Sequence, residues 1–313
     1  MIDKLDGSEY RTYTEQEIID NFPKEDFYVV FGTSHSAGWC DDGTERIMSR
    51  EKNWPSQLEK MCGKPVFNLS IGGITPQMML EVVCEFVYYY GKQSSKCLGA
   101  FIEPRSADHS VMLDISAEIA NETQDDKFVR MAKHHAIACG RDYITKDCIS
   151  NYYNIFNVAR QLNGARYDKY DNDLSNDIQK WIKDTVVYQM LGSYLHFDSL
   201  NILLRMTQVL HSNGIKNHTF YWETHVPELD NDKDTKQIQL MYFNAMSSYI
   251  NRGINYIRCD DKPYLNKRSF DMIKLIEEKT SYDFLQRNYC KCMHYNEQVH
   301  KIAAEIIYEK VFT

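Results

Sequence analysis

Five short apolar segments, rich in β-branched and aromatic residues, are separated along the chain by helical sequence. They are Phe27 to Phe31, Val66 to Leu69, Cys97 to Glu103, His218 to Glu223 and Ile254 to Arg258. Short apolar runs bounded by polar or glycine-containing turns are typical of buried strands. Because a helix is needed to return the chain between parallel strands, this alternation predicts a five-stranded, mainly parallel sheet.

The segments between these strands repeat apolar residues at helical spacing. A capping box at 14–17 predicts a short first helix, and the patterns at 54–61 and 75–90 predict two more. The amphipathic stretch 302–311 predicts a helix at the C-terminal end. Helices on both faces of a parallel sheet make a three-layer α/β/α sandwich of the flavodoxin-like kind.

The stretch 110–213 is longer than a single crossover between strands requires. It contains helical patterns at 177–190 and 196–211, and an Asp- and Asn-rich segment at 168–177 that predicts an exposed loop. We therefore expect one domain over 1–313, with a helical insertion at 110–213 that is a candidate cap over a site.

Charge and hydropathy narrow the class of function. The 313 residues include 36 Lys and Arg and 44 Asp and Glu, a formal net charge of −8. This balance argues against nucleic acid as a partner, because binding to phosphates needs clustered cations. No apolar run approaches the roughly 18 residues that cross a bilayer. The first residues lack the pattern of a secretory signal, so we expect a cytoplasmic protein without a membrane span.

The nine cysteines are irregularly spaced, which predicts free thiols in a reducing compartment. Several lie in or beside apolar segments, as small buried thiols do. These are Cys40, Cys62, Cys84, Cys97 and Cys139.

Polar or glycine-rich residues follow each of the first three predicted strands. Gly32-Thr33-Ser34 follows the first strand, Gly72-Gly73 follows the second, and Glu103-Pro104-Arg105-Ser106 ends the third. The carboxyl ends of parallel strands meet at one edge of a sheet, where ligands collect near the switch in strand order. A serine on a tight turn, with backbone N–H groups free to approach a ligand, suits acyl-transfer chemistry.

His294 stands just before the predicted C-terminal helix. A histidine brought from far along the chain can take the proton of a serine hydroxyl, which is a weak nucleophile alone. Three motifs occur in order: Gly-x-Ser at 32–34, Asn-x-x-x-Gly-Gly-x-Thr at 68–75 and His-x-Asn-x-x-x-His-x-Ile-Ala at 294–303. Together they resemble the SGNH (GDSL-type) hydrolase family.

The resemblance implies a role for several residues. Ser34 would be the nucleophile, His294 its general base, and the backbone N–H groups of Ser34 and Gly73 would bind the oxyanion. The implied activity is hydrolysis of an ester, such as an acyl lipid or an O-acetyl group on a carbohydrate. No metal or organic cofactor is expected.

The chain departs from the family pattern at three places. Thr33 replaces the usual Asp between Gly and Ser. The segment 103–106 replaces Gly-x-Asn-Asp, so the Asn amide of the oxyanion hole is missing, and Arg105 or Ser106 would have to donate instead. Lys291 replaces the Asp that would orient His294. A Ser–His dyad remains, unless a carboxylate comes from Asp283, Asp260 or Glu223.

These departures motivate a second hypothesis from a different class. The chain is then a catalytically degenerate SGNH-like binding or structural module, such as a virion component, with a homo-oligomer or virion assembly as its partner. The degenerate third motif and the long insertion are similar to those of SGNH-like proteins from large phages. Cys290, Cys292 and His294 could also hold a soft metal, although no second pair at finger-like spacing accompanies them.

Overall fold

The centre of the molecule is a parallel sheet of four strands. A computed structural model describes residues 15–38, 52–71, 74, 76–104, 111–112, 153–154, 194–222, 252, 254–257, 271–290 and 294–313. The strands are β1 (Phe27–Phe31), β2 (Val66–Asn68), β3 (Cys97–Ile102) and β6 (Asn217–Thr219). Their order is β2-β1-β3-β6, and each neighbouring pair is parallel. The prediction of an α/β fold with a parallel sheet is confirmed.

The predicted fifth strand pairs with the sheet through an isolated bridge. Tyr256 lies parallel to Thr219, whose N–H donates to Asn255 O at 2.7 Å and whose carbonyl accepts from Ile257 N at 2.7 Å. β6 is also shorter than the predicted 218–223. Beyond it, Tyr221 forms a second parallel bridge, to Asp271.

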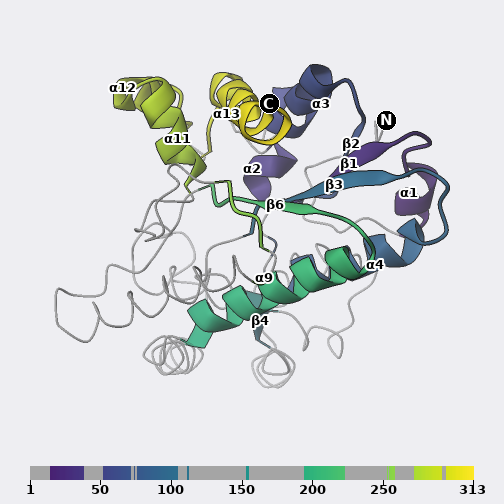
Figure 1. Ribbon diagram of the computed structural model, residues 1–313. Coiled ribbons are helices and arrows are strands. Elements are labelled where there is room, and N and C mark those ends of the chain that lie inside the picture. The colour runs from purple at the N-terminus through teal and green to yellow at the C-terminus, as the bar shows by residue number, and fades with distance from the viewer. Residues whose placement is uncertain are drawn as a thin grey trace, which may run out of the picture.

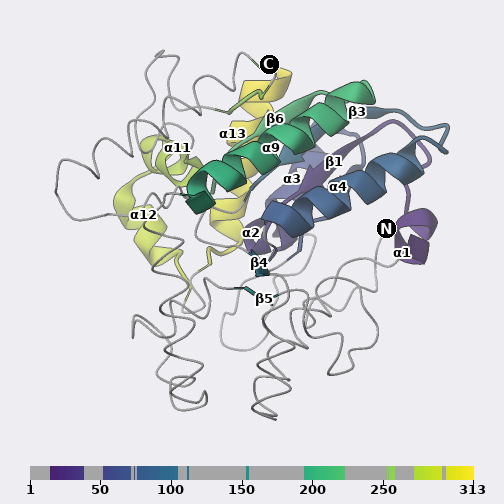
Figure 2. The ribbon, with the colours of Figure 1, turned by 90° about the horizontal axis from the view of Figure 1, so that it is seen from below.

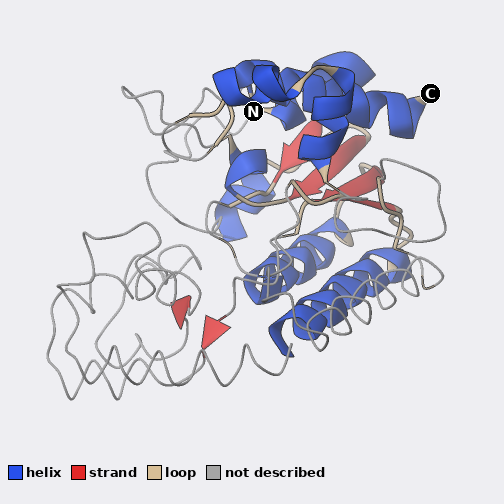
Figure 3. Ribbon diagram, turned by 90° about the vertical axis from the view of Figure 1, so that its left-hand side faces the viewer, coloured by secondary structure: helices blue, strands red, loops and turns tan. Residues whose placement is uncertain are grey.

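Helices cover both faces of the sheet. On one face, α4 (Pro76–Tyr90) packs against α9 (Tyr194–Ser212) and α1 (Glu15–Asp20). On the other face, α3 (Trp54–Cys62) packs against α13 (Glu297–Phe312), which also contacts α11 (Met272–Lys279). α12 (Tyr282–Arg287) lies next to α11, as Figure 1 shows. Figure 3 shows the resulting three layers, and Figure 2 shows α4 and α9 side by side.

The sheet separates two hydrophobic cores, because successive residues of a strand point to opposite faces. Phe27, Val29 and Phe31 of β1 enter the core beneath α4 and α9. Val30 enters the core beneath α3 and α13, where Trp54 packs edge-on against Phe101 and Phe220. The site described below lies where the chain leaves β1 between these cores.

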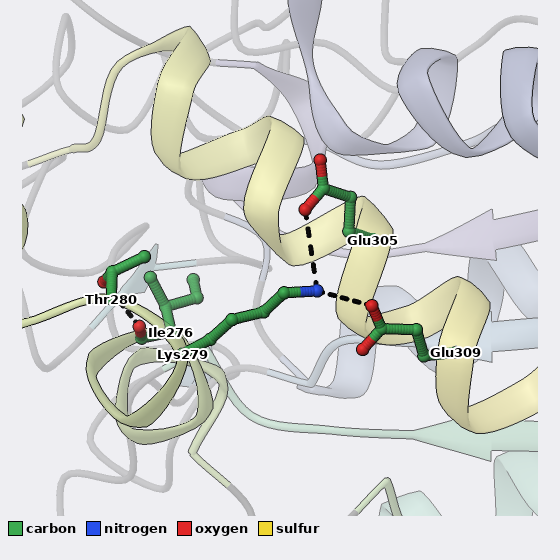
Figure 4. Close-up of polar contacts among 5 residues, drawn as sticks. All are labelled: Ile276, Lys279, Thr280, Glu305 and Glu309. Atoms are coloured by element: carbon green, nitrogen blue, oxygen red, sulfur yellow. Dashed lines mark hydrogen bonds and ion pairs between the residues drawn. The ribbon is translucent and has the colours of Figure 1, made fainter.

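An ion-pair network joins α11 to α13 at the surface. Lys279 Nζ lies 3.5 Å from Glu305 Oε2 and 2.5 Å from Glu309 Oε1 (Figure 4). The hydroxyl of Thr280, next along the chain, donates to the carbonyl of Ile276 at 2.6 Å and closes the end of α11. Exposed ion pairs of this kind contribute roughly 0–1 kcal/mol each to stability. Apolar packing against α13 therefore contributes more than these ion pairs to holding α11 in place.

Part of the predicted insertion at 110–213 belongs to the described structure. α9 covers the predicted helix at 196–211, and β4 (Val111–Met112) pairs in antiparallel fashion with β5 (Tyr153–Asn154). The predicted helix at 177–190 and the predicted loop at 168–177 lie outside the described residues. No helix in the described part of the chain is long and apolar enough to cross a membrane.

The prediction of buried thiols is correct for Cys97 and wrong for Cys84. Cys97 is 3% exposed, and burial raises its pKa to about 12. Cys84 is exposed, because it shares the outer face of α4 with Glu81 while Val83 points inward. Cys62 is half-buried at the end of α3. Cys40 and Cys139 lie outside the described residues.

Candidate active site

The candidate site lies at the carboxyl ends of β1 and β3. From β1 the chain moves to β2 on one side and then to β3 on the other, so the strand order switches between β1 and β3. Open parallel sheets form a ligand-binding crevice at such a switch. The short helix α2 (Ser34–Ala37) follows β1 (Figure 1). Ser34 is its first residue, and Glu103 follows β3 directly.

The structure brings Ser34 and His294 together. Ser34 Oγ lies 2.8 Å from His294 Nε2, although 260 positions separate the two residues in sequence. This is the length of a direct hydrogen bond. When the ring proton is on Nδ1, Nε2 accepts the serine proton, which is the arrangement that a general base needs. Ser34 is 5% exposed and His294 is half-buried.

A buried carboxylate holds the turn that carries Ser34. Glu103 Oε2 accepts hydrogen bonds from Thr33 N at 2.9 Å, Ser36 N at 3.3 Å and Ser36 Oγ at 2.5 Å. Glu103 Oε1 accepts from Thr33 Oγ1 at 2.6 Å. Glu103 is 2% exposed. Glu103, the first residue of the segment 103–106, therefore binds the serine turn from within the protein.

Ser36 connects this carboxylate to neighbouring elements. Trp54 Nε1, at the start of α3, donates to Ser36 Oγ at 2.9 Å. Asn68 Nδ2, at the end of β2, donates to the Ser36 carbonyl at 2.9 Å, and Asn53 Nδ2 donates to it at 3.4 Å. The serine turn is thus bonded to β2, β3 and α3.

The segment that carries His294 is fixed on both sides. Tyr289 and Tyr295 form an antiparallel bridge, and Cys290 N donates to the carbonyl of His294 at 2.7 Å. Asn296 donates to Asn288 twice, from its backbone N–H at 3.1 Å to the carbonyl and from Nδ2 to Oδ1 at 2.8 Å. The Asn296 side chain also caps α13 by accepting from Gln298 N. These bonds set the position from which His294 reaches Ser34.

Aromatic and imidazole rings pack around the pair. The His35 ring lies 4.8 Å from the His294 ring and stacks on Trp222 at 4.9 Å. The Trp222 ring lies 5.1 Å from that of His300, whose Nδ1 accepts from Trp54 N at 3.2 Å. Burial, with the nearby His294, lowers the pKa of His300 to about 3, and the Tyr295 carbonyl partly opposes this shift. His300 is therefore neutral at physiological pH.

Several residues predicted for the site lie outside the described residues. They are Gly73, Arg105, Ser106 and Lys291, together with Asp260 and Glu223. Asp283, also considered as a carboxylate partner, is exposed on α12, and its carbonyl accepts from Arg287 Nε. In the part of the chain that the structure describes, no group of three or more His, Cys, Asp or Glu side chains could hold a metal ion.

The sequence did not reveal the roles of Glu103, Ser36 and Trp54 at the site. Glu103 stood out as a polar residue after a buried strand, and that was the available signal. Its partners depend on the pairing of β3 with β1, which aligns Ile102 with Phe31 and so brings Glu103 beside the turn that follows β1.

Comparisons with solved structures find distant similarities to three esterases and lipases or related proteins. The chain is similar to TesA, with 11% identity and a TM-score of 0.44 over 91% of this chain and 98% of that one. It is similar to the psychrotrophic esterase EstA from Pseudoalteromonas sp., with 10% identity and a TM-score of 0.43 over 92% and 97%. A GDSL-like lipase from Bacteroides thetaiotaomicron has 11% identity and a TM-score of 0.41 over 95% and 96%. No protein-family model and no curated protein matches the chain. At such low identities and TM-scores, these similarities do not assign the chain to a family.

Proposed function

We propose that the chain is a serine ester hydrolase in which Ser34 is the nucleophile and His294 is the general base. The observation that carries the proposal is the 2.8 Å contact between Ser34 Oγ and His294 Nε2, made by residues 260 positions apart. A serine hydroxyl becomes an effective nucleophile when a base accepts its proton during attack. The site at the strand-order switch provides this pairing at an edge where ligands bind.

The reaction follows from the positions of these two groups. Ser34 Oγ bonds to the ester carbonyl carbon while His294 Nε2 takes the hydroxyl proton. The bond from that carbon to the alcohol oxygen then breaks, and the alcohol leaves with the proton from Nε2. Water attacks the acyl-serine next, gives a proton to Nε2 and releases the acid, and Ser34 regains that proton.

The oxyanion is proposed to bind the backbone N–H groups of Ser34 and Gly73, with Arg105 or Ser106 as a side-chain donor. Glu103 is an acceptor in all four of its bonds to the serine turn, so the Glu103 carboxylate is not itself proposed as the side-chain donor. The proposed substrate is a small ester, such as an O-acetyl group on a carbohydrate. The insertion at 110–213 is proposed to cover the substrate, except for α9, which packs against α4 in the sandwich.

The test compares Ser34→Ala and His294→Gln with the wild type. Covalent labelling by a fluorophosphonate probe should disappear in Ser34→Ala, and p-nitrophenyl acetate turnover should fall with it. His294→Gln should lower kcat by roughly 10²–10⁴-fold, the usual contribution of general base catalysis. Ser212→Ala is the matched control, because Ser212 is an exposed serine at the end of α9 whose loss should change neither readout.

Turnover that persists in Ser34→Ala, or labelling at another residue, would show that this proposal is wrong. Wild-type protein that neither reacts with the probe nor hydrolyses the ester would favour the second hypothesis, a binding or structural module with an SGNH-like fold.

A further inference from the structure

We propose that Glu103 is a positioning residue for this hydrolase, whose buried carboxylate holds the serine turn at the distance from His294 that proton transfer requires. The inference rests on the proposed function of Ser34 and His294. It assigns to Glu103 a function in catalysis that acts through the turn and involves no contact with substrate.

Glu103 forms hydrogen bonds with residues on both sides of Ser34 in the sequence. Thr33 precedes Ser34 and donates to both carboxylate oxygens, through its N–H at 2.9 Å and its hydroxyl at 2.6 Å. Ser36 follows Ser34 and donates through its N–H at 3.3 Å and its hydroxyl at 2.5 Å. With the backbone fixed on both sides, Ser34 has little freedom to move away from His294.

The direction of each hydrogen bond is set by chemistry. An indole N–H can only donate, so Ser36 Oγ accepts from Trp54 Nε1 at 2.9 Å. The Ser36 proton is then available to Glu103 Oε2. Every contact between Glu103 and the turn therefore uses the carboxylate as an acceptor, and charge-assisted bonds of this kind are stronger than neutral ones.

The same network reaches the helix that His294 precedes. Trp54 donates from its backbone N–H to Nδ1 of the fully buried His300 on α13, at 3.2 Å. Bonds through Glu103, Ser36, Trp54 and His300 thus connect the serine turn to α13 through the protein interior. This connection joins the two elements whose separation sets the Ser34–His294 distance.

The experiment compares kcat and KM for Glu103→Ala and Glu103→Gln, using p-nitrophenyl acetate. Glu103→Ala should lower kcat by about 10²-fold, the effect of misplacing a reacting group by about 1 Å, with KM little changed. Glu103→Gln should restore most of kcat. Its amide oxygen can accept from Thr33 N and Ser36, and its N–H₂ can donate to Thr33 Oγ1, which is free to accept as a hydroxyl.

Asn217→Ala is the matched control for the loss of a buried polar anchor. Asn217 is 1% exposed. Its Oδ1 accepts two hydrogen bonds of 3.3 Å each, from Asn255 N and from Thr219 Oγ1. This variant should lose stability and keep kcat at a temperature where it is folded. If Glu103→Ala does not fold, Ser36→Ala, which loses one hydroxyl of the network, should still lower kcat.

The inference would be overturned if a folded Glu103→Ala or Ser36→Ala variant had the wild-type kcat. It would also be overturned if the kcat of Glu103→Gln were as low as that of Glu103→Ala. These results are distinct from a failure of the proposed function. If Ser34→Ala is inactive and Glu103→Ala is fully active, only the role of Glu103 is wrong. If Ser34→Ala keeps full activity, the proposed function itself is wrong.

Discussion

Gly32 is packed too closely by its neighbours to carry a side chain. A Cβ at Gly32 would lie 2.5 Å from both Cβ and Oγ of Ser36, and 2.8 Å from Glu103 Oε2. Hydrogen bonds hold these atoms in place, so they cannot easily move aside. We predict that Gly32→Ala lowers the free energy of unfolding by about 1–3 kcal/mol. Displacement of Ser34 should also slow fluorophosphonate labelling by about 10²-fold.

Gly91→Ala is the control for this substitution. Its Cβ would meet only the carbonyls of Val87 and Tyr88, at 3.7 Å and 3.9 Å, which are ordinary contacts. Urea unfolding should show a change within about 1 kcal/mol, and the labelling rate should stay at the wild-type value. Equal labelling rates for Gly32→Ala and the wild type would contradict the close packing described here.

The pairing of Ser34 with His294 could be predicted from the sequence, but the role of Glu103 could not. The order of motifs along the chain indicated that a serine after the first strand and a histidine before the last helix would meet. A carboxylate after a strand can instead face solvent, a ligand or another turn. Only the register of β3 against β1, set by packing of the whole sheet, places Glu103 beside Thr33 and Ser36.

At the scale of elements, hydrophobic periodicity predicted β1, β3 and the main helices well, because each has enough apolar residues of its own. It overestimated β6, predicted as 218–223 and observed as Asn217–Thr219. Where a strand ladder ends depends on its neighbours as well as on its own composition. Beyond β6, Tyr221 accepts from Met272 N, and Trp222 packs against the rings of His35 and His300.

Helix α13 carries a buried imidazole that should make the fold sensitive to acid. The pKa of His300 is about 3 in the folded protein, mainly because of burial, against about 6.5 in an unfolded chain. The unfolded state therefore binds one more proton between these pH values, so stability is full above pH 6.5 and falls as the pH drops toward 3. At pH 5 the expected loss from this group is about 2 kcal/mol.

Urea unfolding at pH 7.5 and pH 5 checks this effect in the wild type and in His300→Asn. The Asn side chain can still accept from Trp54 N but cannot take up the proton, so the variant should lose about 2 kcal/mol less than the wild type on acidification. The same acid-induced loss in His300→Asn and in the wild type would rule out His300 as the source.

At the scale of the whole molecule, the two faces of the sheet differ in their relation to the site. The core beneath α4 and α9 contacts the sheet but contributes none of the bonds between Trp54, Ser36 and His300 that the structure describes. The core beneath α3 and α13 supports both helices that carry those bonds. Stability should therefore depend on both cores, and the geometry of the site mainly on the second.

Two buried leucines allow a matched comparison of the cores. Leu58 on α3 and Leu203 on α9 are both 0% exposed, one in each core. Either substitution by Ala should lower the free energy of unfolding by about 2–5 kcal/mol, measured in urea. Fluorophosphonate labelling of the folded protein should slow in Leu58→Ala, because α3 then shifts with Trp54, and should stay near the wild-type rate in Leu203→Ala. Equal slowing in both variants would mean that the site depends on overall stability and that α3 and α13 have no special role in holding Ser34 against His294.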